Sequence, residues 1–349
     1  MSAFIRVGLV ADNPNFPAEW DAVLTKARIA DELGFDSLWL GETWGYDIFT
    51  SLADVMRVTT QIKLGIGIAN VFSRTPGVIA TTAATLDERS NGRVILGLGS
   101  SGPQVIEHWH GVAYEKPLQR IHEYVDIINM MIRRDPLIYH GQIFQLDRGF
   151  KLRFKPIRSH IPIYIAALTP KSVAQAGAIA DGLLPTFWPI DHLADLRVEI
   201  DAGSVAAGHA PSSVAIAPYL TTALIANEEQ RAIARQMARA PIAWYIGRMG
   251  TFYADMLRRN GYGDEVEATL AGWQRGPGAA ASGISDRLLD ATAIIGTPVE
   301  VAVRLHEWVA AGVTTPLISM PPGDPAAAGA LLGMLRDALA VPTTSSENS

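Results

Sequence analysis

The chain alternates short apolar runs with longer stretches in which apolar residues recur at helical spacing. In its first third, the short runs predict buried strands at 5–11, 36–40, 64–68 and 93–98. The longer stretches predict amphipathic helices at 20–33, 48–60 and 76–90. The run at 64–68 contains two glycines, and glycine inside a strand is typical of a bulge or of a close approach by ligand or backbone.

The same alternation continues to residue 319. Further strands are predicted at 163–166, 181–184, 214–226 and 315–319, and further helices at 117–133, 170–180, from 191 onward and at 298–311. About eight strand–helix alternations without a change in composition favour a single (β/α)₈ TIM barrel over a doubly wound sheet. In such a barrel the loops after the strands meet at the carboxyl edge, where ligands bind.

Three segments depart from this rhythm. Residues 104–114 show no regular pattern, and 137–154 predict a β-hairpin outside the main sheet. Residues 228–292 predict a helical insertion that bears on substrate and subunit contacts. We therefore expect one domain over 1–342, followed by a disordered polar tail at 343–349.

Composition narrows the class of protein. Of 349 residues, 48% are hydrophobic and 18% charged, which suits a large core. A formal net charge of -6 without a basic stripe argues against nucleic acid as a partner. No apolar stretch is long enough to span a bilayer, and the start of the chain has no signal-peptide pattern, so we expect no membrane partner and a cytoplasmic location. The absence of cysteine excludes disulfides, thiolate metal sites and cysteine catalysis.

Two loops after predicted strands carry candidate binding groups. The first offers backbone N–H groups and hydroxyls without bulk, which suits an anion or a flat polar ring; its residues are Gly99, Ser100, Ser101, Gly102 and Pro103. In the second, a threonine can cap a helix whose first turn binds an anion; its residues are Ala166, Ala167, Leu168, Thr169, Lys171 and Ser172. A plain capped helix is the alternative for the second loop.

Aromatic residues at strand ends predict a substrate pocket wall, with ordinary packing as the alternative; they are Trp44, Tyr46, Phe187 and Trp188. Residues 97–102 depart from the G-x-G-x-x-G fingerprint, and no acidic residue follows in the required place. The sequence also lacks the P-loop, zinc-protease and nucleophile-elbow motifs. His108 and His110 have no obvious further ligands nearby, so we expect no metal site.

Taken together, several segments resemble the luciferase-like family of flavin- and deazaflavin-dependent oxidoreductases. They lie between residue 5 and about residue 319, at 30–42, 67–76, 83–100, 166–172, 295–298 and 311–313. Within that family, residues 99–105 and 108–111 look most like the branch that uses the deazaflavin coenzyme F420. This branch includes proteins similar to methylenetetrahydromethanopterin reductase.

The resemblance implies a barrel that holds its coenzyme at the carboxyl ends of the strands. Many members hold the ring against a bulge with a non-prolyl cis peptide, which corresponds here to the bond between Gly67 and Ile68. Ala69 and Asn70 would then line the ring, with Glu42 and the loop at 99–103 around the ring and its polyol chain. The loop at 166–172 would take the phosphate. The resemblance also implies a homodimer.

The resemblance also bears on the reaction. Sugar-phosphate dehydrogenases of the family carry an acidic residue after the glycine-rich loop, and residues 101–104 contain none. We therefore expect hydride transfer between coenzyme F420 and a small organic substrate with an unsaturated or imine-like bond. Candidate proton donors are Glu42, Tyr46 and His108.

Two alternatives remain open for the function. One is an FMN-dependent two-component monooxygenase that uses reduced flavin and oxygen, for which a flavin or coenzyme F420 reductase would be a partner. The other is a noncatalytic homologue that binds a flavin-like ligand. The glycine loops and the anion-type loop favour an enzyme over that second alternative, because a site without function has no need of them.

Overall fold

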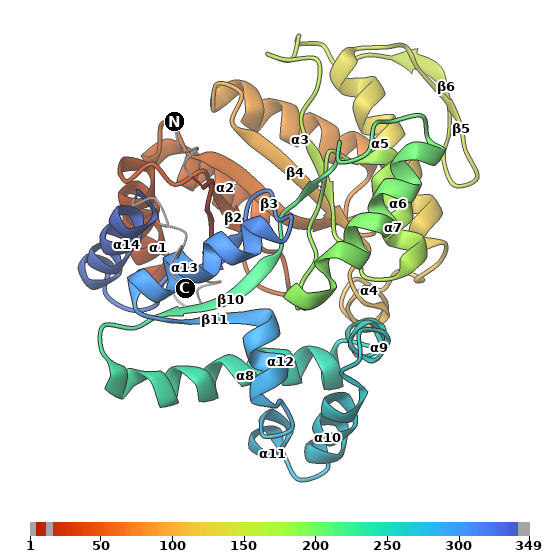
Figure 1. Ribbon diagram of the computed structural model, residues 1–349. Coiled ribbons are helices and arrows are strands. Elements are labelled where there is room, and N and C mark those ends of the chain that lie inside the picture. The colour runs from red at the N-terminus through yellow and green to blue at the C-terminus, as the bar shows by residue number, and fades with distance from the viewer. Residues whose placement is uncertain (1–4, 12–16, 341–349) are drawn as a thin grey trace.

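The computed structural model describes residues 5–11 and 17–340 (Figure 1). Parallel strands, most of them followed by a helix, form the centre of the molecule. The strands are β1 Gly8–Val10, β2 Ser37–Leu40, β3 Lys63–Asn70, β4 Val94–Gly99, β7 Ile163–Ile165, β8 Gly182–Leu183, β9 Ala215–Ile216, β10 Tyr219–Leu224, β11 Ala293–Gly296 and β12 Leu317–Ser319. The helices that come after these strands are α1 Pro17–Glu32, α2 Ile48–Val58, α3 Pro76–Arg89, α5 Pro117–Arg133, α6 Pro170–Ile179, α7 Leu193–Ala206, α13 Pro298–Ala310 and α14 Pro325–Ala340. The predicted tail at 343–349 lies outside the described residues.

The sheet curls until its two ends meet. Neighbouring strands pair in parallel in the order β12, β1, β2, β3, β4, β7, β8 and β9. The two ends of this series, β9 and β12, are not themselves paired as strands. There the Ala217 N–H donates to Leu183 at 2.9 Å, and the Pro218 carbonyl accepts from the Leu317 N–H at 3.0 Å. The stretch from β9 into β10 therefore links β8 to β12, and the predicted TIM-barrel fold is confirmed.

One predicted strand is divided in the structure. Residues 214–226 form two strands, because the chain changes neighbours near Pro218, which has no N–H to donate. Beyond Pro218, β10 extends past the closed barrel of strands and pairs with β11. The hydrophobic pattern did not predict β11. The helix α14 after the last strand was also not predicted.

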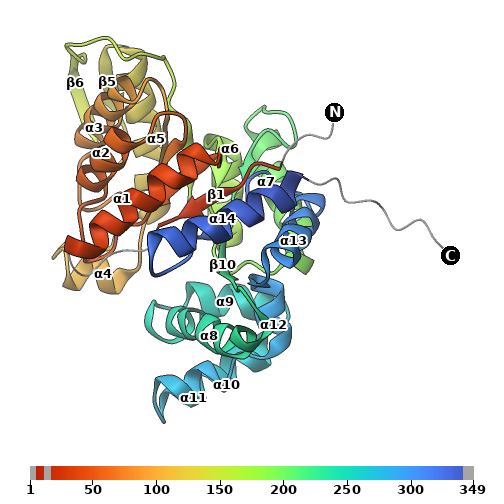
Figure 2. The same ribbon diagram turned by 90° about the vertical axis from the view of Figure 1, so that its left-hand side faces the viewer.

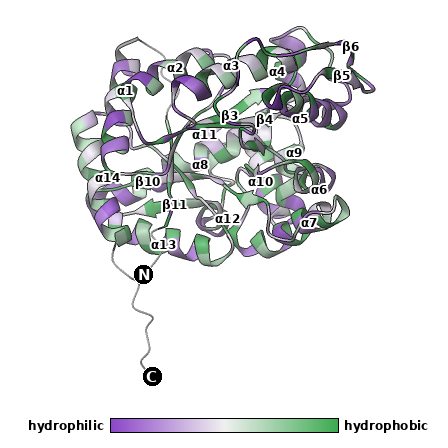
Figure 3. Cartoon of the chain, turned by 90° about the horizontal axis from the view of Figure 1, so that it is seen from above, coloured by the Kyte–Doolittle hydropathy of each residue, from purple (hydrophilic) through white to green (hydrophobic). Residues whose placement is uncertain are grey.

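Two apolar clusters hold the barrel. The larger one lies between strands and helices, and in the view from above helices with mixed hydropathy surround the strands (Figure 3). The smaller one comes from strands on all sides and so fills the inside of the barrel; it contains Trp39, Ile95, Leu184, Ala217 and Leu317. The fully buried Trp39 explains a glycine of the third strand, since a Cβ atom at Gly65 would overlap its ring.

The excursions from the barrel are mostly as predicted. β5 Leu137–His140 and β6 Gln145–Phe150 form a separate antiparallel sheet, which confirms the hairpin. The prediction of an irregular 104–114 is wrong at its start, where α4 Pro103–His108 forms with proline in its first turn. The insertion is helical as predicted and lies to one side of the barrel (Figures 1 and 2). It comprises α8 Arg231–Arg248, α9 Phe252–Arg259, α10 Gly263–Trp273, α11 Pro277–Ala281 and α12 Asp286–Thr292.

No helix within 5–11 and 17–340 is long and apolar enough to cross a membrane.

Candidate active site

A cavity of about 810 Å³ lies where the strands end. Its walls come from the loops after β1, β2, β4, β7 and β8, from the strands β3 and β10, and from the inserted helices α8 and α9. This volume lies within the usual range for small-molecule and coenzyme sites. In a barrel of this kind the carboxyl edge is also where catalytic groups are found.

Most of the predicted site residues line this cavity. They are Glu42, Trp44, Gly67, Ile68, Gly99, Ser100, Ser101, Gly102, Ala166, Ala167, Leu168, Thr169, Ser172 and Phe187. The remaining predicted residues lie outside the lining; they are Tyr46, Ala69, Asn70, Pro103, His108, Lys171 and Trp188. The structure thus brings both predicted loops to one cavity.

The bulge in β3 forms one wall. The pairing of β3 with β4 shifts register between Ile66 and Ala69, and the peptide bond between Gly67 and Ile68 is cis. The resemblance indicated this same bond. The Tyr219 hydroxyl donates a hydrogen bond to the Gly67 carbonyl at 3.2 Å. A Cβ atom at Gly67 would overlap that hydroxyl, so the bulge and the tyrosine fit together only with glycine there.

Two predicted ring contacts lie behind the bulge. Ala69 and Asn70 are buried and do not reach the cavity lining. The Asn70 side-chain oxygen accepts hydrogen bonds from the backbone N–H groups of Phe72 and Ser73 at 3.0 and 2.8 Å. Asn70 therefore shapes the turn after β3.

A tyrosine supports the loop after β4. The Tyr114 hydroxyl donates to the Ser100 hydroxyl at 2.9 Å, and its ring stacks on Phe72 with centroids 5.2 Å apart. Ser101 in this loop has a φ of +56°, in the left-handed region. Burial raises the pKa of Tyr114. The sequence analysis did not predict Tyr114 as a site residue. Its aromatic side chain was the only indication, because the segment around it shows no periodicity.

The second loop opens α6 with a capping box. The Ser172 N–H donates to the Thr169 hydroxyl at 3.2 Å, and the Thr169 N–H donates to the Ser172 hydroxyl at 3.0 Å. Pro170 has no N–H, so the Lys171 N–H remains as a free donor of the first turn within the described structure. The Lys171 side chain is exposed. Arg259 of the insertion donates to the Leu168 carbonyl at 2.9 Å.

An ion-pair network borders the cavity beside β2. Arg74 donates to both carboxylate oxygens of Glu42, at 2.7 and 2.6 Å, and also pairs with Asp47. These hydrogen bonds, the one with Glu42 foremost, raise the pKa of Arg74. The carboxylate of Glu42 is thus held in a fork-like pair.

Three other predicted residues have neighbours outside the cavity. Tyr46 is 44% exposed, and its ring lies 6.1 Å from that of Trp20. His108 is exposed on α4. Trp188 is only 1% exposed, and its ring N–H donates to the His192 carbonyl at 3.0 Å. A role for any of them in the site stays a prediction.

Three aromatic rings pack together above the barrel. Phe187 follows β8, Tyr245 lies on α8 and Tyr253 on α9, and all three line the cavity. Tyr245 and Tyr253 have ring centroids 4.7 Å apart, and Phe187 lies 5.3 Å from the first and 6.1 Å from the second. Of these, the sequence pattern indicated only Phe187, because the packing of the insertion on the barrel was not predictable.

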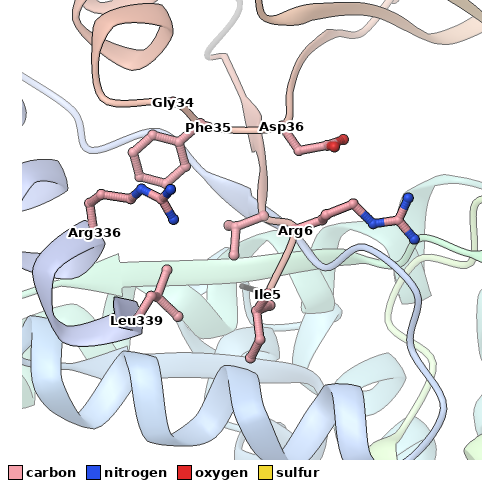
Figure 4. A pocket seen from close by; sticks show the side chains of 8 residues that line it. Ile5, Arg6, Gly34, Phe35, Asp36, Arg336 and Leu339 are labelled. Carbon is pink, nitrogen blue, oxygen red and sulfur yellow. The ribbon is translucent and has the colours of Figure 1, made fainter. Parts of the chain in front are cut away.

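A smaller pocket lies at the opposite end of the barrel (Figure 4). It measures about 120 Å³, and its walls include the residues just before β1 and β2; they are Ile5, Arg6, Val7, Gly34, Phe35, Asp36, Arg336 and Leu339. This pocket is far too small for a coenzyme. Among the described residues, no group of three or more His, Asp or Glu side chains is arranged to hold a metal ion.

Known proteins have sequences or structures similar to those of this chain. A protein of Mycobacterium tuberculosis, provisionally named as a coenzyme F420-dependent oxidoreductase, is 35% identical over 83% of this chain and 88% of its own. The 5,10-methylenetetrahydromethanopterin reductase of Archaeoglobus fulgidus is 32% identical over 85% and 88%. Among solved structures, the coenzyme F420-dependent tetrahydromethanopterin reductase of Methanopyrus kandleri superposes with a TM-score of 0.80 at 25% identity, over 95% and 98%.

The family model described as luciferase-like monooxygenase matches residues 2–315, nearly the whole chain. The resemblance inferred from the sequence is thereby confirmed, and the protein belongs to the luciferase-like monooxygenase family.

Proposed function

We propose that this protein is an oxidoreductase that transfers a hydride between coenzyme F420 and a small organic substrate. The observation that carries the proposal is the bulge between Ile66 and Ala69 in the wall of the large cavity, beside the loop at 99–102. A bulge of this kind lets a flat ring approach the backbone closely, because Gly67 and Gly99 carry no side chains.

We expect the ring, the polyol chain and the phosphate of the coenzyme to bind different parts of the cavity. The ring would lie on the bulge, and the hydroxyls of Ser100 and Ser101 would bind the polyol chain. The hydroxyls of Thr169 and Ser172, with the free Lys171 N–H and the dipole of α6, would hold the phosphate. When bound, the deazaflavin supplies a carbon, C5, that gives or accepts the hydride.

The relatives support the same coenzyme. Two proteins more than 30% identical to this chain, and covered over most of their length, are named for coenzyme F420 or for a reductase of 5,10-methylenetetrahydromethanopterin. The substrate of the present protein does not follow from those names.

The proton donor remains part of the proposal. Of the three candidates, Glu42 alone lines the cavity, and both of its oxygens accept hydrogen bonds from Arg74. A substrate that needs a proton would have to receive it from Glu42 after this pair opens, or from a cavity hydroxyl.

A second candidate is the FMN-dependent monooxygenase, which the family description favours. The two candidates differ in chemistry, because the carbon of a deazaflavin at C5 suppresses the reaction with oxygen that a flavin undergoes. The hydrogen peroxide formed per oxygen consumed by reduced FMN, measured with and without the protein in the presence of neutral organic compounds, separates them. Free reduced FMN converts all of its oxygen to peroxide, whereas a monooxygenase transfers one oxygen atom to its substrate and releases the other as water. The proposal predicts equal peroxide yields in both samples, and a protein-dependent fall in the yield would favour the monooxygenase.

The phosphate end of the site allows a direct test of the binding mode. Calorimetry would compare coenzyme F420 with the same deazaflavin lacking its phosphate-bearing tail. We expect the complete coenzyme to bind about tenfold more tightly, and Ser172→Ala to reduce this ratio. Equal affinities for both compounds would contradict the assignment of α6 to the phosphate.

A further inference from the structure

We infer that the substrate is an uncharged molecule with a flat apolar body, which binds against the wall formed by Phe187, Tyr245 and Tyr253. The inference rests on the proposed function, since it assigns to the substrate the part of the cavity that the coenzyme leaves free. It adds a substrate class and the residues that select it.

The first reason is the charge of the cavity. Among the described residues that line it, Glu42 is the one charged side chain, and Arg74 neutralises it from behind. Lysine, arginine and histidine are absent from that described lining. A carboxylate or phosphate on the substrate would leave water without a cationic partner, which is strongly unfavourable.

The second reason is the shape and chemistry of the wall. Tyr245 and Tyr253 meet Phe187 at interplanar angles of 62° and 65°, so the rings form an angled surface. Pro241, Met249 and Phe252 extend this surface with apolar groups. Aromatic walls favour flat partners that stack on a ring face or meet its edge.

The third reason lies in the tyrosine hydroxyls. The Tyr219 hydroxyl donates its hydrogen bond to the Gly67 carbonyl. The hydroxyls of Tyr245 and Tyr253, which also line the cavity, have no hydrogen-bond partner in the part of the chain that the structure describes. Burial raises the pKa of both, so each stays a protonated donor. They would pair with a neutral acceptor such as a carbonyl oxygen.

The wall and the coenzyme loops belong to different parts of the chain. Tyr245 and Tyr253 come from inserted helices, and the loops at 99–102 and 166–172 come from the barrel. Changes in the wall should therefore alter the choice of substrate and leave coenzyme binding intact.

Three probes test the inference by calorimetry on the full chain loaded with oxidised coenzyme F420, a state without turnover. Benzylideneacetone is a neutral aromatic enone, trans-cinnamate has nearly the same shape with a negative charge, and 3-penten-2-one lacks the ring. We expect benzylideneacetone to bind at least about tenfold more tightly than either of the others. Absence of binding by benzylideneacetone, or equal affinity of trans-cinnamate, would overturn the inference.

Variants locate the effect. Tyr245→Phe and Tyr253→Phe should each weaken benzylideneacetone binding by about threefold to tenfold, if each hydroxyl contributes one hydrogen bond. Tyr139→Phe is the matched control, because its hydroxyl bonds Asp126 at 2.9 Å outside the cavity. Met249→Lys places a cation in the wall and should shift the preference toward trans-cinnamate. An unchanged preference in Met249→Lys would count against the placement of the substrate.

The same samples keep the two proposals apart. The probe titrations are repeated without coenzyme, and coenzyme F420 is titrated in every variant. A protein that prefers the neutral enone but fails to bind coenzyme F420 would refute the proposed function and keep the substrate class. A protein that binds coenzyme F420 but prefers trans-cinnamate would refute the substrate class and keep the proposed function.

Discussion

At the scale of single residues, the glycines of β3 decide what the site can be. Gly65 leaves room for the Trp39 ring, and Gly67 leaves room for the Tyr219 hydroxyl. The sequence predicted a bulge or a close approach in this strand, and the structure contains both. The sequence could not predict which residue approaches Gly67, because Tyr219 is 152 residues away along the chain.

The Gly67→Ala variant tests the fit between the bulge and its tyrosine. The added methyl group would overlap the Tyr219 hydroxyl, so we expect a loss of about 1–3 kcal/mol in the free energy of unfolding. Deazaflavin affinity should fall as well, because the bulge must shift. Gly77→Ala is the control, since nothing lies within 4 Å of a Cβ atom at that position. Equal denaturant midpoints for the two variants would contradict the prediction.

The Tyr114→Phe variant tests the support of the loop after β4. It removes the hydrogen bond to the Ser100 hydroxyl and keeps the stack on Phe72. We expect about fivefold weaker binding of coenzyme F420 by fluorescence titration, which corresponds to about 1 kcal/mol. An affinity equal to that of Tyr139→Phe would show that the loop does not depend on this bond.

The sequence located site residues best where they follow a strand. The loops at 99–102 and 166–169 line the cavity because the carboxyl ends of parallel strands meet at one edge. Asn70 ends β3 and Trp188 lies after β8, but their side chains turn into the protein. Local sequence does not state which face of a turn a side chain takes, and here tertiary packing decided it.

At the scale of elements, one buried carboxylate holds the excursion at β5 and β6. Glu123 of α5 accepts hydrogen bonds from the backbone N–H groups of Gln142, Ile143 and Phe144, and from the side chain of Gln119. Burial alone would raise the pKa of Glu123, but these hydrogen bonds lower it. The hairpin turn is therefore fixed to α5 by an ionised group.

The Glu123→Gln variant tests that link. An amide cannot accept all of these bonds, so we expect a loss of about 1–3 kcal/mol in the free energy of unfolding. Because the folded state has the lower pKa, Glu123 stabilises the wild type above its ordinary value of 4.5, and this contribution is lost as the pH falls below it. Urea midpoints should thus depend less on acid pH in the variant. Glu88→Gln, at an exposed helix position, should behave as the wild type.

Periodicity identified most of the long helices and buried strands, including the helical insertion, but it missed β11 and α14. It failed at α4, where Pro103 begins a short helix that has too few residues to show a period. It also missed the break at Pro218, because residues on both sides are equally apolar and only the change of neighbouring strands separates β9 from β10.

At the scale of the whole molecule, the cavity lies between the barrel and its insertion. The barrel supplies the bulge and two polar loops, and the inserted helices supply the aromatic wall. The alternation of strand and helix patterns in the sequence predicted the fold class. It did not predict that the barrel and the insertion would each supply part of the cavity, since this depends on how the insertion packs on the barrel. The homodimer remains a prediction, and sedimentation against the chain mass of 37.6 kDa would test it.

The buried tyrosines around the cavity predict a limit of stability at alkaline pH. Burial raises the pKa of Tyr219 and of Tyr253 above the ordinary value of 10.0. The unfolded chain would then release these protons first, so the free energy of unfolding should fall as the pH rises above about 10. Urea unfolding between about pH 9 and pH 11 would show it. Tyr253→Phe should flatten this dependence, and an unchanged slope would contradict the assignment.

The identity of the coenzyme is tested by a parallel titration of the purified protein with oxidised coenzyme F420 and with FMN, followed by intrinsic fluorescence. Trp44 and the tyrosines of the cavity lining are suitable reporters. We expect tight, saturable binding of coenzyme F420 and much weaker binding of FMN. Tight binding of FMN with weak binding of coenzyme F420 would contradict this expectation and point to the flavin-dependent monooxygenase.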